Sequence, residues 1–319
     1  MSRALADLTA FRETRRSYLG GTDLAAITGV STWAGPVSVY LDKTDPEQAE
    51  DKNSLLMRRG LALERFIMDE FMRARPGLVC WHPKPIVRTD WGFPAGASID
   101  FFVADARKPR TPVAVLEAKT AFRNGWSVWD EDSADLPDSY YVQQQWYLAV
   151  TALSLSYGAA DVGDDKLRIV PVEADARIQQ RLIEAGREFW QEHVAKRIPP
   201  APLGLEADYG ALQRVWTETI PDPPVQLEPE EAEAVLSDFL AHKFEEAEHK
   251  KAAELAKQTL CALMGEHEKA TVGNWLLSWK RSTTNSIDTK RLRAERPDIV
   301  AKYTRTSESR TFAAPKETT

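Results

Sequence analysis

The spacing of apolar residues predicts a helical start to the chain. From Asn53 to Arg73, apolar residues recur every three or four positions, as on one face of an amphipathic helix. The residues expected near that face are Leu56, Leu63, Phe66, Ile67 and Phe71. Shorter helices are expected over Ser2–Tyr18, Leu24–Thr28 and Pro36–Asp42.

The middle of the chain is strand-like. Its runs are short, apolar or β-branched, and proline, glycine and aspartate interrupt them. The expected strands are Val79–His82, Ile86–Thr89, Gly96–Ala104, Val113–Lys119 and Lys166–Pro171. Helices are expected over Tyr140–Leu153 and Asp175–Ala195. The pattern therefore predicts a β core between helices.

The periodicity weakens after residue 198. Six prolines lie between Pro199 and Pro224, which is typical of a linker. A long charged helix (Glu228–Glu266), a strand (Gly273–Arg281), a short helix (Thr289–Glu295) and a disordered tail from Pro315 are expected to follow. We therefore predict a core at 1–198, a proline-rich linker at 199–227 and a C-terminal extension at 228–319.

Composition and charge limit the class of protein. The net charge of −7 argues mildly against nucleic-acid binding, but Trp279–Arg310 holds nine lysines and arginines against four acidic residues. Two distant cysteines, Cys80 and Cys261, show neither metal-ligand spacing nor a disulfide framework. No apolar run reaches the roughly 18 residues of a membrane span. We expect a cytoplasmic protein.

The candidate chemistry centres on three residues at two strand-like runs. Asp100 follows the first run, and Glu117 and Lys119 end the second. Residues i and i+2 of a strand share a face, so Glu117 and Lys119 are expected to point the same way, with Asp100 delivered beside them. Two carboxylates can hold a hard divalent cation, and a lysine can position a water or stabilise charge on a phosphate. This set predicts a metal-dependent nuclease.

Two helical segments add polar side chains to that prediction. Glu64 lies four residues after Gly60, a glycine that would let another backbone come close, and can add a third carboxylate. Tyr140, Gln143 and Gln144 have helical spacing, and their neutral groups can hold a lysine or a water. By themselves these residues also fit a polar helix surface.

A glycine-rich turn near the N-terminus predicts an anion site. Gly20 and Gly21 precede a helix whose first N–H groups can face an anion. Arg15, the Thr22 hydroxyl and the Ser98 hydroxyl can complete a phosphate pocket. A capped helix after a turn is the alternative.

Together these pieces resemble the phage lambda exonuclease family, also called YqaJ-type viral recombinases or alkaline exonucleases, of the restriction-endonuclease-like PD-(D/E)xK superfamily. The match runs from about Arg15 to Arg197. It consists, in the family order, of R-x6-T at Arg15–Thr22, G-x3-E at Gly60–Glu64, S-x-D at Ser98–Asp100, E-x-K at Glu117–Lys119 and Y-x2-Q-x-Q at Tyr140–Gln145. Thr22 stands where a serine is usual, and the chain extends well past the nuclease core.

The resemblance implies an α/β (α+β) restriction-endonuclease-like fold, in which a central mixed sheet is flanked by helices. It implies a Mg²⁺-dependent exonuclease, with Mn²⁺ as a substitute, that digests one strand of linear duplex DNA from the 5′ end to 5′-mononucleotides. The 3′ overhangs would serve homologous recombination by strand annealing. It also implies a ring-shaped homotrimer around DNA, a phage single-strand annealing protein as partner, and a phage or prophage origin in a bacterial host.

The resemblance also assigns roles to residues. Asp100 and Glu117 would be metal ligands, and Glu64 would complete the metal shell. Lys119 would position the nucleophilic water, steadied by Gln143 and Tyr140. The residues expected to bind the 5′-phosphate or DNA are Arg15, Thr22, Ser98 and Gln145.

Two alternatives stay open at this point. The first is a structure-specific or restriction-type endonuclease on the same core. The second is a catalytically silent phage DNA-binding protein.

Overall fold

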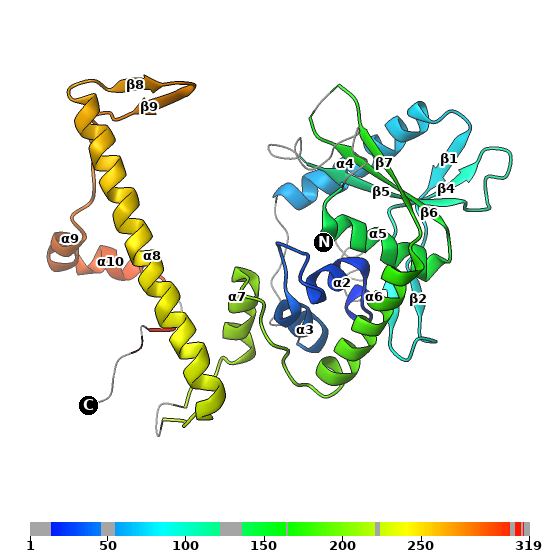
Figure 1. Cartoon of the computed structure of the whole chain (residues 1–319), viewed down its shortest axis with the longest axis horizontal. Helices are drawn as coiled ribbons and strands as arrows, with labels where there is room; N and C mark the ends of the chain where they lie inside the picture. Colours follow the sequence, from blue (N-terminus) through cyan, green and yellow to red (C-terminus); the bar gives the residue numbers. More distant parts are fainter. Residues whose placement is uncertain are drawn as a thin grey trace. The chain divides into compact units, whose positions relative to one another are not determined.

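The computed structural model describes residues 14–45, 55–121, 136–163, 165–220, 224–306, 310–313 and 315. The chain forms two compact units, Met1–Thr217 and Glu218–Thr319 (Figure 1). Inside the first unit, helix α7 (Glu206–Val215) packs on helix α3 (Pro36–Thr44). The segment predicted to be a linker, 199–227, therefore contains a helix that belongs to the core. Its proline-rich start conceals this helix in the sequence.

A five-stranded mixed sheet forms the centre of the first unit, in the order β1-β4-β5-β6-β7. Its strands are β1 (Leu78–Trp81), β4 (Phe101–Asp105), β5 (Ala114–Thr120), β6 (Leu155–Asp161) and β7 (Arg168–Glu173). β5 and β6 are parallel, and the other neighbours are antiparallel. Strands β2 (Ile86–Arg88) and β3 (Ala95–Ala97) form a separate pair. The predicted mixed sheet flanked by helices is confirmed.

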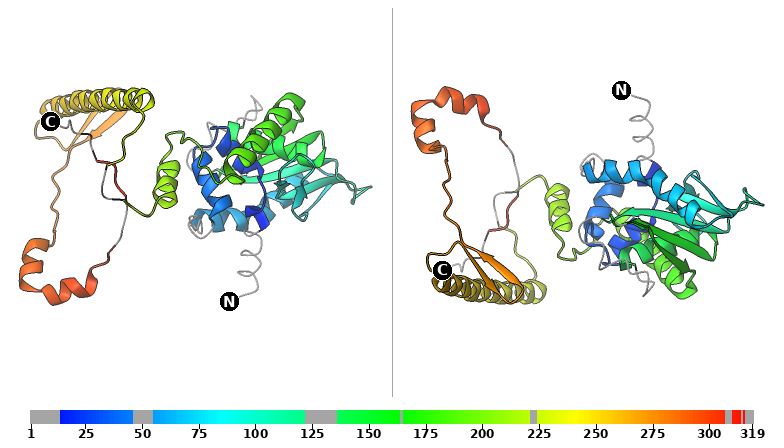
Figure 2. Two further views of the ribbon diagram at one scale, coloured as in Figure 1. Left: turned by 90° about the horizontal axis from the view of Figure 1, so that it is seen from below. Right: turned by 90° about the horizontal axis from the view of Figure 1, so that it is seen from above.

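Helices cover both faces of the central sheet (Figure 2). On one face, Ile67 and Phe71 of α4 (Leu55–Ala74) pack against Leu116 of β5. On the other face, Val115 of β5 packs with Trp146 in a cluster built from several helices. These helices are α2 (Gly21–Ile27), α3, α5 (Asp138–Thr151) and α6 (Ala176–Phe189) with its π-helical continuation η2 (Trp190–Val194). Because alternate residues of β5 serve opposite faces, one strand anchors both layers.

Several element predictions were wrong in detail. The expected strand Gly96–Ala104 is split, since β3 ends at Ala97 and β4 begins at Phe101. Strand β6 has no counterpart in the prediction, because its small residues (Gly158, Ala159 and Ala160) give no β-branched signal. Phe66 is 48% exposed and so does not join the apolar face of α4. The predicted tail beyond Pro315 and most of the helix Ser2–Tyr18 lie outside the described residues.

The second unit contains the long helix α8 (Pro229–Met264), the hairpin β8–β9 (Lys269–Val272 and Trp275–Ser278) and two short helices, α9 (Thr289–Glu295) and α10 (Pro297–Tyr303). β8 and α10 were not expected from the sequence. Most of its apolar side chains are exposed. Cys80 and Cys261 are both free. None of the helices described is both long and apolar enough to cross a membrane.

Candidate active site

Strand β5 presents Glu117 and Lys119 on the same side, as the two-residue period predicts. Lys119 Nζ lies 2.5 Å from Glu117 Oε1 and donates a hydrogen bond to it. The Glu117 side chain is 3% exposed and that of Lys119 is 20% exposed. Ala118 between them points into the core beneath α4. The strand therefore holds a buried carboxylate and a partly exposed ammonium group next to each other.

Asp100 reaches the same place from the bend before β4. Its Oδ2 accepts a hydrogen bond from the backbone N–H of Ala118 at 2.9 Å, which ties the bend to the middle residue of the Glu-x-Lys sequence. The Asp100 carbonyl contacts His82 Nδ1 at 2.7 Å. The break between β3 and β4 therefore positions the site, because the bend turns the Asp100 side chain toward β5.

The two carboxylates affect each other. Burial, and then the charge of Glu117, hold the pKa of Asp100 well above its ordinary value, although Lys119 opposes this shift. Burial opposes the charged form of Lys119, but the charges of Glu117 and Asp100 outweigh it and raise the pKa of the lysine. Glu117 Oε2 is buried and has no hydrogen-bond partner within the described residues. The repulsion between Asp100 and Glu117, and the Glu117 oxygen without a partner among the described residues, would both be relieved by one more positive charge.

Glu64 approaches this pair from α4. Burial, and then the charge of Glu117, raise the pKa of Glu64, so the helix brings the side chain within electrostatic reach. Among the residues described, however, no three histidine, cysteine, aspartate or glutamate side chains are grouped closely enough to hold a metal ion. The direct role of Glu64 in a metal shell stays a prediction.

The prediction that Gly60 lets another backbone come close was wrong. A Cβ atom at that position would meet only Thr120 Oγ1, at 3.9 Å, which is an ordinary contact. The close approach occurs instead at Gly21, where a Cβ would lie 3.0 Å from the Gln143 carbonyl oxygen. This glycine lets α2 lie directly against α5, the helix that carries the glutamines.

Helix α5 supplies a directed chain of hydrogen bonds. Gln143 Nε2 donates to Glu117 Oε1 at 2.8 Å and to the Tyr147 hydroxyl at 2.7 Å. The Tyr147 hydroxyl in turn donates to the Ser98 carbonyl at 3.0 Å. Since the carboxylate and the carbonyl can only accept, the hydroxyl must accept from Gln143, and the amide must present its NH₂ group to both partners. Tyr147 therefore fixes the orientation of the amide that holds Glu117.

The other three predicted residues of α5 behave differently. Gln144 is fully buried, and its Oε1 accepts a hydrogen bond from Ser156 Oγ at 2.8 Å. Tyr140 meets Lys119 through its ring, whose centroid lies 4.8 Å from Lys119 Nζ, in a cation–π contact. Gln145 is fully buried, and its amide bonds the Glu173 carbonyl and the Asp175 N–H. The prediction that Gln145 binds DNA is wrong, because two residues along a helix is more than half a turn away from Gln143.

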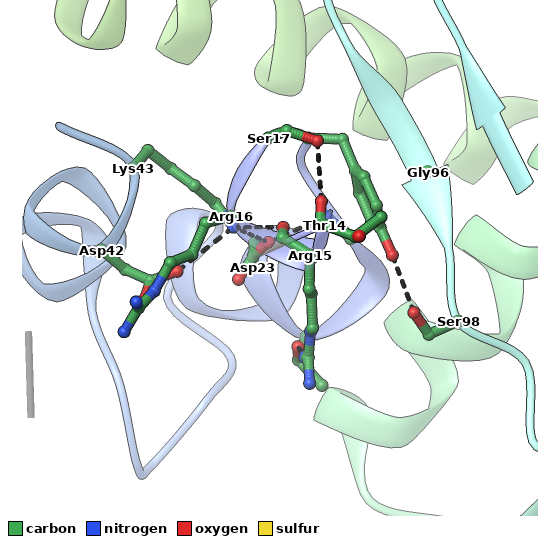
Figure 3. Close-up of polar contacts among 12 residues, drawn as sticks. Thr14, Arg15, Arg16, Ser17, Asp23, Asp42, Lys43, Gly96 and Ser98 are labelled. Carbon is green, nitrogen blue, oxygen red and sulfur yellow. Dashed lines mark hydrogen bonds and ion pairs between the residues drawn. The ribbon is translucent and has the colours of Figure 1, made fainter. Parts of the chain in front are cut away.

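The N-terminal residues predicted to bind phosphate lie next to this centre. The Arg15 guanidinium donates to Thr22 Oγ1, and Ser98 Oγ hydrogen-bonds the Tyr18 hydroxyl at 2.7 Å (Figure 3). Helix α2 begins at Gly21, so Thr22 lies in its first turn. The arginine and both hydroxyls therefore converge from three segments of the chain.

A buried ion pair supports this corner. Lys43 Nζ lies 2.9 Å from Asp23 Oδ2, and its side chain is 1% exposed. The same ammonium donates to the Arg15 carbonyl at 3.2 Å, and Asp23 Oδ2 accepts from the Gly20 N–H at 2.8 Å. Burial opposes ionisation of Asp23, but the charges of Lys43 and Arg15 outweigh it and lower the pKa of the carboxyl. The ion pair thus fixes the glycine turn and Arg15 (Figure 3).

One cavity of about 370 Å³ collects these groups. Its polar lining residues are Arg15, Tyr18, Thr22, Glu64, Ser98, Asp100, Glu117, Lys119, Thr120, Gln143 and Tyr147. A larger hollow of about 660 Å³ lies near Tyr141 and Arg177 and contains none of the predicted site residues. Sequence reasoning missed Tyr18 and Tyr147. Tyr147 could have been found, since it lies one helical turn after Gln143.

The donor set fits a hard divalent cation. The buried carboxylate of Glu117 and the half-buried carboxylate of Asp100 offer only oxygen, and Glu117 Oε2 lacks a partner among the described residues. Mg²⁺ is usually held by one or two carboxylates, with waters and substrate phosphate as the other ligands. A site with two carboxylates, and no group of three histidine, cysteine, aspartate or glutamate side chains among the described residues, is compatible with this mode of Mg²⁺ binding.

Comparisons with known proteins agree with the sequence resemblance. Residues 10–154 match the YqaJ-like viral recombinase domain. The chain is 28% identical over 301 residues to the uncharacterized protein YqaJ of Bacillus subtilis (strain 168), an alignment that covers 93% of this chain and 91% of that protein. At this coverage the similarity extends into the second unit.

Solved structures are more distantly similar. An alkaline exonuclease of Laribacter hongkongensis, LHK-Exo, is 17% identical and covers 60% of this chain and 100% of its own, with a TM-score of 0.41. The structure of LHK-Exo in complex with dAMP gives a TM-score of 0.44, and the match covers 57% of this chain and 91% of that chain. A phage-related exonuclease of Haemophilus somnus 129PT is 11% identical and gives 0.39, with 59% and 100% covered.

The family match spans the site from Arg15 to Gln143, including the bend that carries Asp100 and the strand that carries Glu117. The central sheet is mixed and lies between helices, as the resemblance implied. Residues 10–154 of the chain thus match the model of the YqaJ-like viral recombinase domain.

Proposed function

We propose that this protein is a metal-dependent deoxyribonuclease that digests one strand of linear double-stranded DNA from its 5′ end. The products would be 5′-mononucleotides and a 3′ single-stranded overhang, as strand-annealing recombination requires. One observation supports this most strongly. The paired carboxylates of Asp100 and Glu117, with Lys119, line the same cavity as Arg15 and Thr22.

Asp100 and Glu117 would hold Mg²⁺, with Mn²⁺ as a substitute, and Glu64 would assist from α4. When bound, the ion would polarise the scissile phosphate and lower the pKa of a water molecule. Its charge would also relieve the repulsion between the buried carboxylate of Glu117 and the half-buried carboxylate of Asp100.

The chain's own residues then have separate tasks. Lys119, held by Glu117 and by the ring of Tyr140, would donate to the attacking water or to a phosphate oxygen. Gln143 and Tyr147 would keep Glu117 in one orientation. Groups that are already in position need not reorganise during the reaction. This preorganisation is the main source of electrostatic catalysis.

Arg15, Thr22 and Ser98 would bind the terminal 5′-phosphate. A guanidinium group forms strong charge-assisted hydrogen bonds to phosphate, and both hydroxyls can donate. A pocket that accepts only a chain end favours exonucleolytic over internal cleavage. This assignment predicts that 5′-phosphorylated duplex is degraded faster than 5′-hydroxyl duplex, and that Arg15→Ala removes the difference. Equal rates in the parent protein would refute it.

The resemblance to the family leads us to extend the proposal to the assembly. A homotrimeric ring would encircle duplex DNA and retain it between cleavages, and a phage single-strand annealing protein would receive the overhang. Affinity for the DNA backbone would weaken steeply with salt. Sedimentation at several protein concentrations tests the trimer independently of activity.

A time course on linear duplex labelled at either end tests the activity. With Mg²⁺ we expect mononucleotides from the 5′ label first, no release in EDTA, and no cutting of closed circular DNA. Lys119→Ala and Asp100→Ala should abolish release while the circular dichroism spectrum stays unchanged. Nicking of the circle would favour the endonuclease alternative. Binding of the duplex without any cleavage in Mg²⁺ would favour the catalytically silent protein.

A further inference from the structure

The hairpin of the second unit carries two exposed tryptophans on one face. Strand alternation puts Trp275, Leu277 and Trp279 on the same side, and the backbone N–H of Trp279 continues the pairing by donating to the Glu268 carbonyl at 2.9 Å. Leu277 is half-buried, whereas Trp275 is 76% exposed and Trp279 is 50% exposed. A flat aromatic group at each end of a strand is unusual on a free surface, because tryptophan is costly to leave in water.

The chain directly after this face is basic. Trp279–Arg310 holds nine lysines and arginines and four acidic residues. Two of those acids are already used, since Glu295 pairs with Arg291 and Asp298 with Arg296. Six cations form no ion pair within the described part of the chain. They are Lys280, Arg281, Lys290, Arg293, Lys302 and Arg305.

We propose that the Trp275–Trp279 face and the basic segment that follows it, residues 280–305, bind single-stranded DNA. Bases stack on aromatic side chains whatever their identity, and cations along a groove or arm follow the backbone phosphates. An exposed ring and two cations without an ion pair in the described part of the chain occur here in consecutive residues, Trp279, Lys280 and Arg281. The surface therefore offers rings for base stacking and cations for the backbone phosphates, the two kinds of contact that bind a single strand.

Charge favours this occupant over another copy of the chain. The exposed acidic side chains of α8 are what a second copy could offer to these cations, but Glu246 and Glu254 already pair with Lys243 and Lys257 of the same helix. A single DNA strand can pair its phosphates with the cations and stack its unpaired bases on the tryptophans at the same time. The choice of DNA over RNA rests on the proposed function, which leaves a single DNA strand as its product.

Binding can be measured on the full chain in EDTA, which stops the proposed hydrolysis without a mutation. The probe is a fluorescent oligo-dT, followed by anisotropy, with oligo-U of equal length in parallel. We expect Trp275→Ala with Trp279→Ala to weaken binding about tenfold per tryptophan. Trp275→Phe with Trp279→Phe should bind within about threefold of the parent protein, because phenylalanine still stacks.

Matched variants separate this site from general charge and exposure. Lys280→Ala with Arg281→Ala should lower the slope of log affinity against log salt by about 1.4, two single-strand phosphate contacts. Lys250→Ala with Lys251→Ala removes the same charge from exposed positions of α8 and should leave affinity unchanged. Trp33→Ala, at a tryptophan 82% exposed in the first unit, should also have no effect.

Four results would overturn the inference. The first is equal affinity of the parent protein and the double alanine variant at the tryptophans. The second is an equal loss in the α8 control, and the third is tighter binding of oligo-U than of oligo-dT. A change of oligomeric mass in the phenylalanine variant, without loss of affinity, would also assign the face to another copy. Nucleotide release with Mg²⁺ is scored separately, so failure of the proposed function leaves this result unaffected.

Discussion

Tyr147→Phe is the most informative single change in the first unit. It removes one oxygen atom from a buried helix and leaves every proposed contact with DNA or cation in place. The lost hydroxyl accepts from Gln143 and donates to the Ser98 carbonyl. The perturbation therefore tests whether the orientation of Gln143, and through it of Glu117, matters.

The expected magnitude follows from those two hydrogen bonds. Each contributes about 0.5–1.5 kcal/mol net, so the variant should lose about 2 kcal/mol of unfolding free energy. For a unit of this size that loss lowers Tm by about 4–8 °C. Gln143 also bonds a carboxylate, and loosening a bond of about 1.4 kcal/mol decreases kcat about tenfold. KM should not change, because Tyr147 touches no proposed DNA-binding group except through Ser98.

The assays are urea unfolding and steady-state nucleotide release from linear duplex. Tyr157→Phe is the control, because its ring packs on Phe71 at 5.2 Å and its hydroxyl makes no hydrogen bond within the described residues. The control should match the parent protein in both assays. Parent-like stability and kcat in Tyr147→Phe would refute the reasoning. Equal losses in both variants would show only that the sheet tolerates no change.

The remaining predictions concern the frame around the site. Asp23→Asn should cost about 3 kcal/mol at pH 7, because it leaves the buried Lys43 ammonium with only the longer ion pair to Asp42, at 3.4 Å. The lowered pKa of Asp23 adds stability above the carboxyl pKa of the unfolded chain, and that stability is lost as pH falls through the folded pKa, so unfolding curves of variant and parent should converge in acid. Gly21→Ala should cost about 1–3 kcal/mol by forcing α2 off α5, whereas Gly60→Ala should stabilise α4 by about 0.5–1 kcal/mol; the opposite order in thermal melts would contradict the packing. Asp208→Ala should release α7 to proteolysis, because this buried carboxylate accepts two backbone N–H groups from outside its own helix, and an undigested α7 would disprove its anchoring role.

The catalytic strand was the part of the site most open to prediction. A two-residue period fixes where Glu117 and Lys119 point, and nothing in the fold competes with it. Asp100 was predicted to be near them, but the bend that delivers it was not, because an apolar run such as Ile99–Val103 looks the same whether the strand is continuous or broken. The bond from Ala118 that holds the bend is a tertiary contact.

The missed features share a physical cause. β6 is made of small residues because it is buried in the sheet between β5 and β7, and burial leaves no periodic signal. Gln145 stands in an attractive polar run, yet its partners Glu173 and Asp175 are nearly thirty residues away. Helix α7 follows a proline-rich stretch, and the carboxylate of Asp208 that docks it on α3 is visible only in three dimensions.

The central claim is that Asp100 and Glu117 together hold a divalent cation in the cavity shared with Lys119 and Arg15. Anomalous diffraction from crystals grown with Mn²⁺ tests it most directly. We expect a manganese peak bonded to one oxygen of each carboxylate, and no such peak in crystals of Glu117→Gln. A peak elsewhere in the chain, or none at saturating Mn²⁺ with both side chains ordered, would contradict the account.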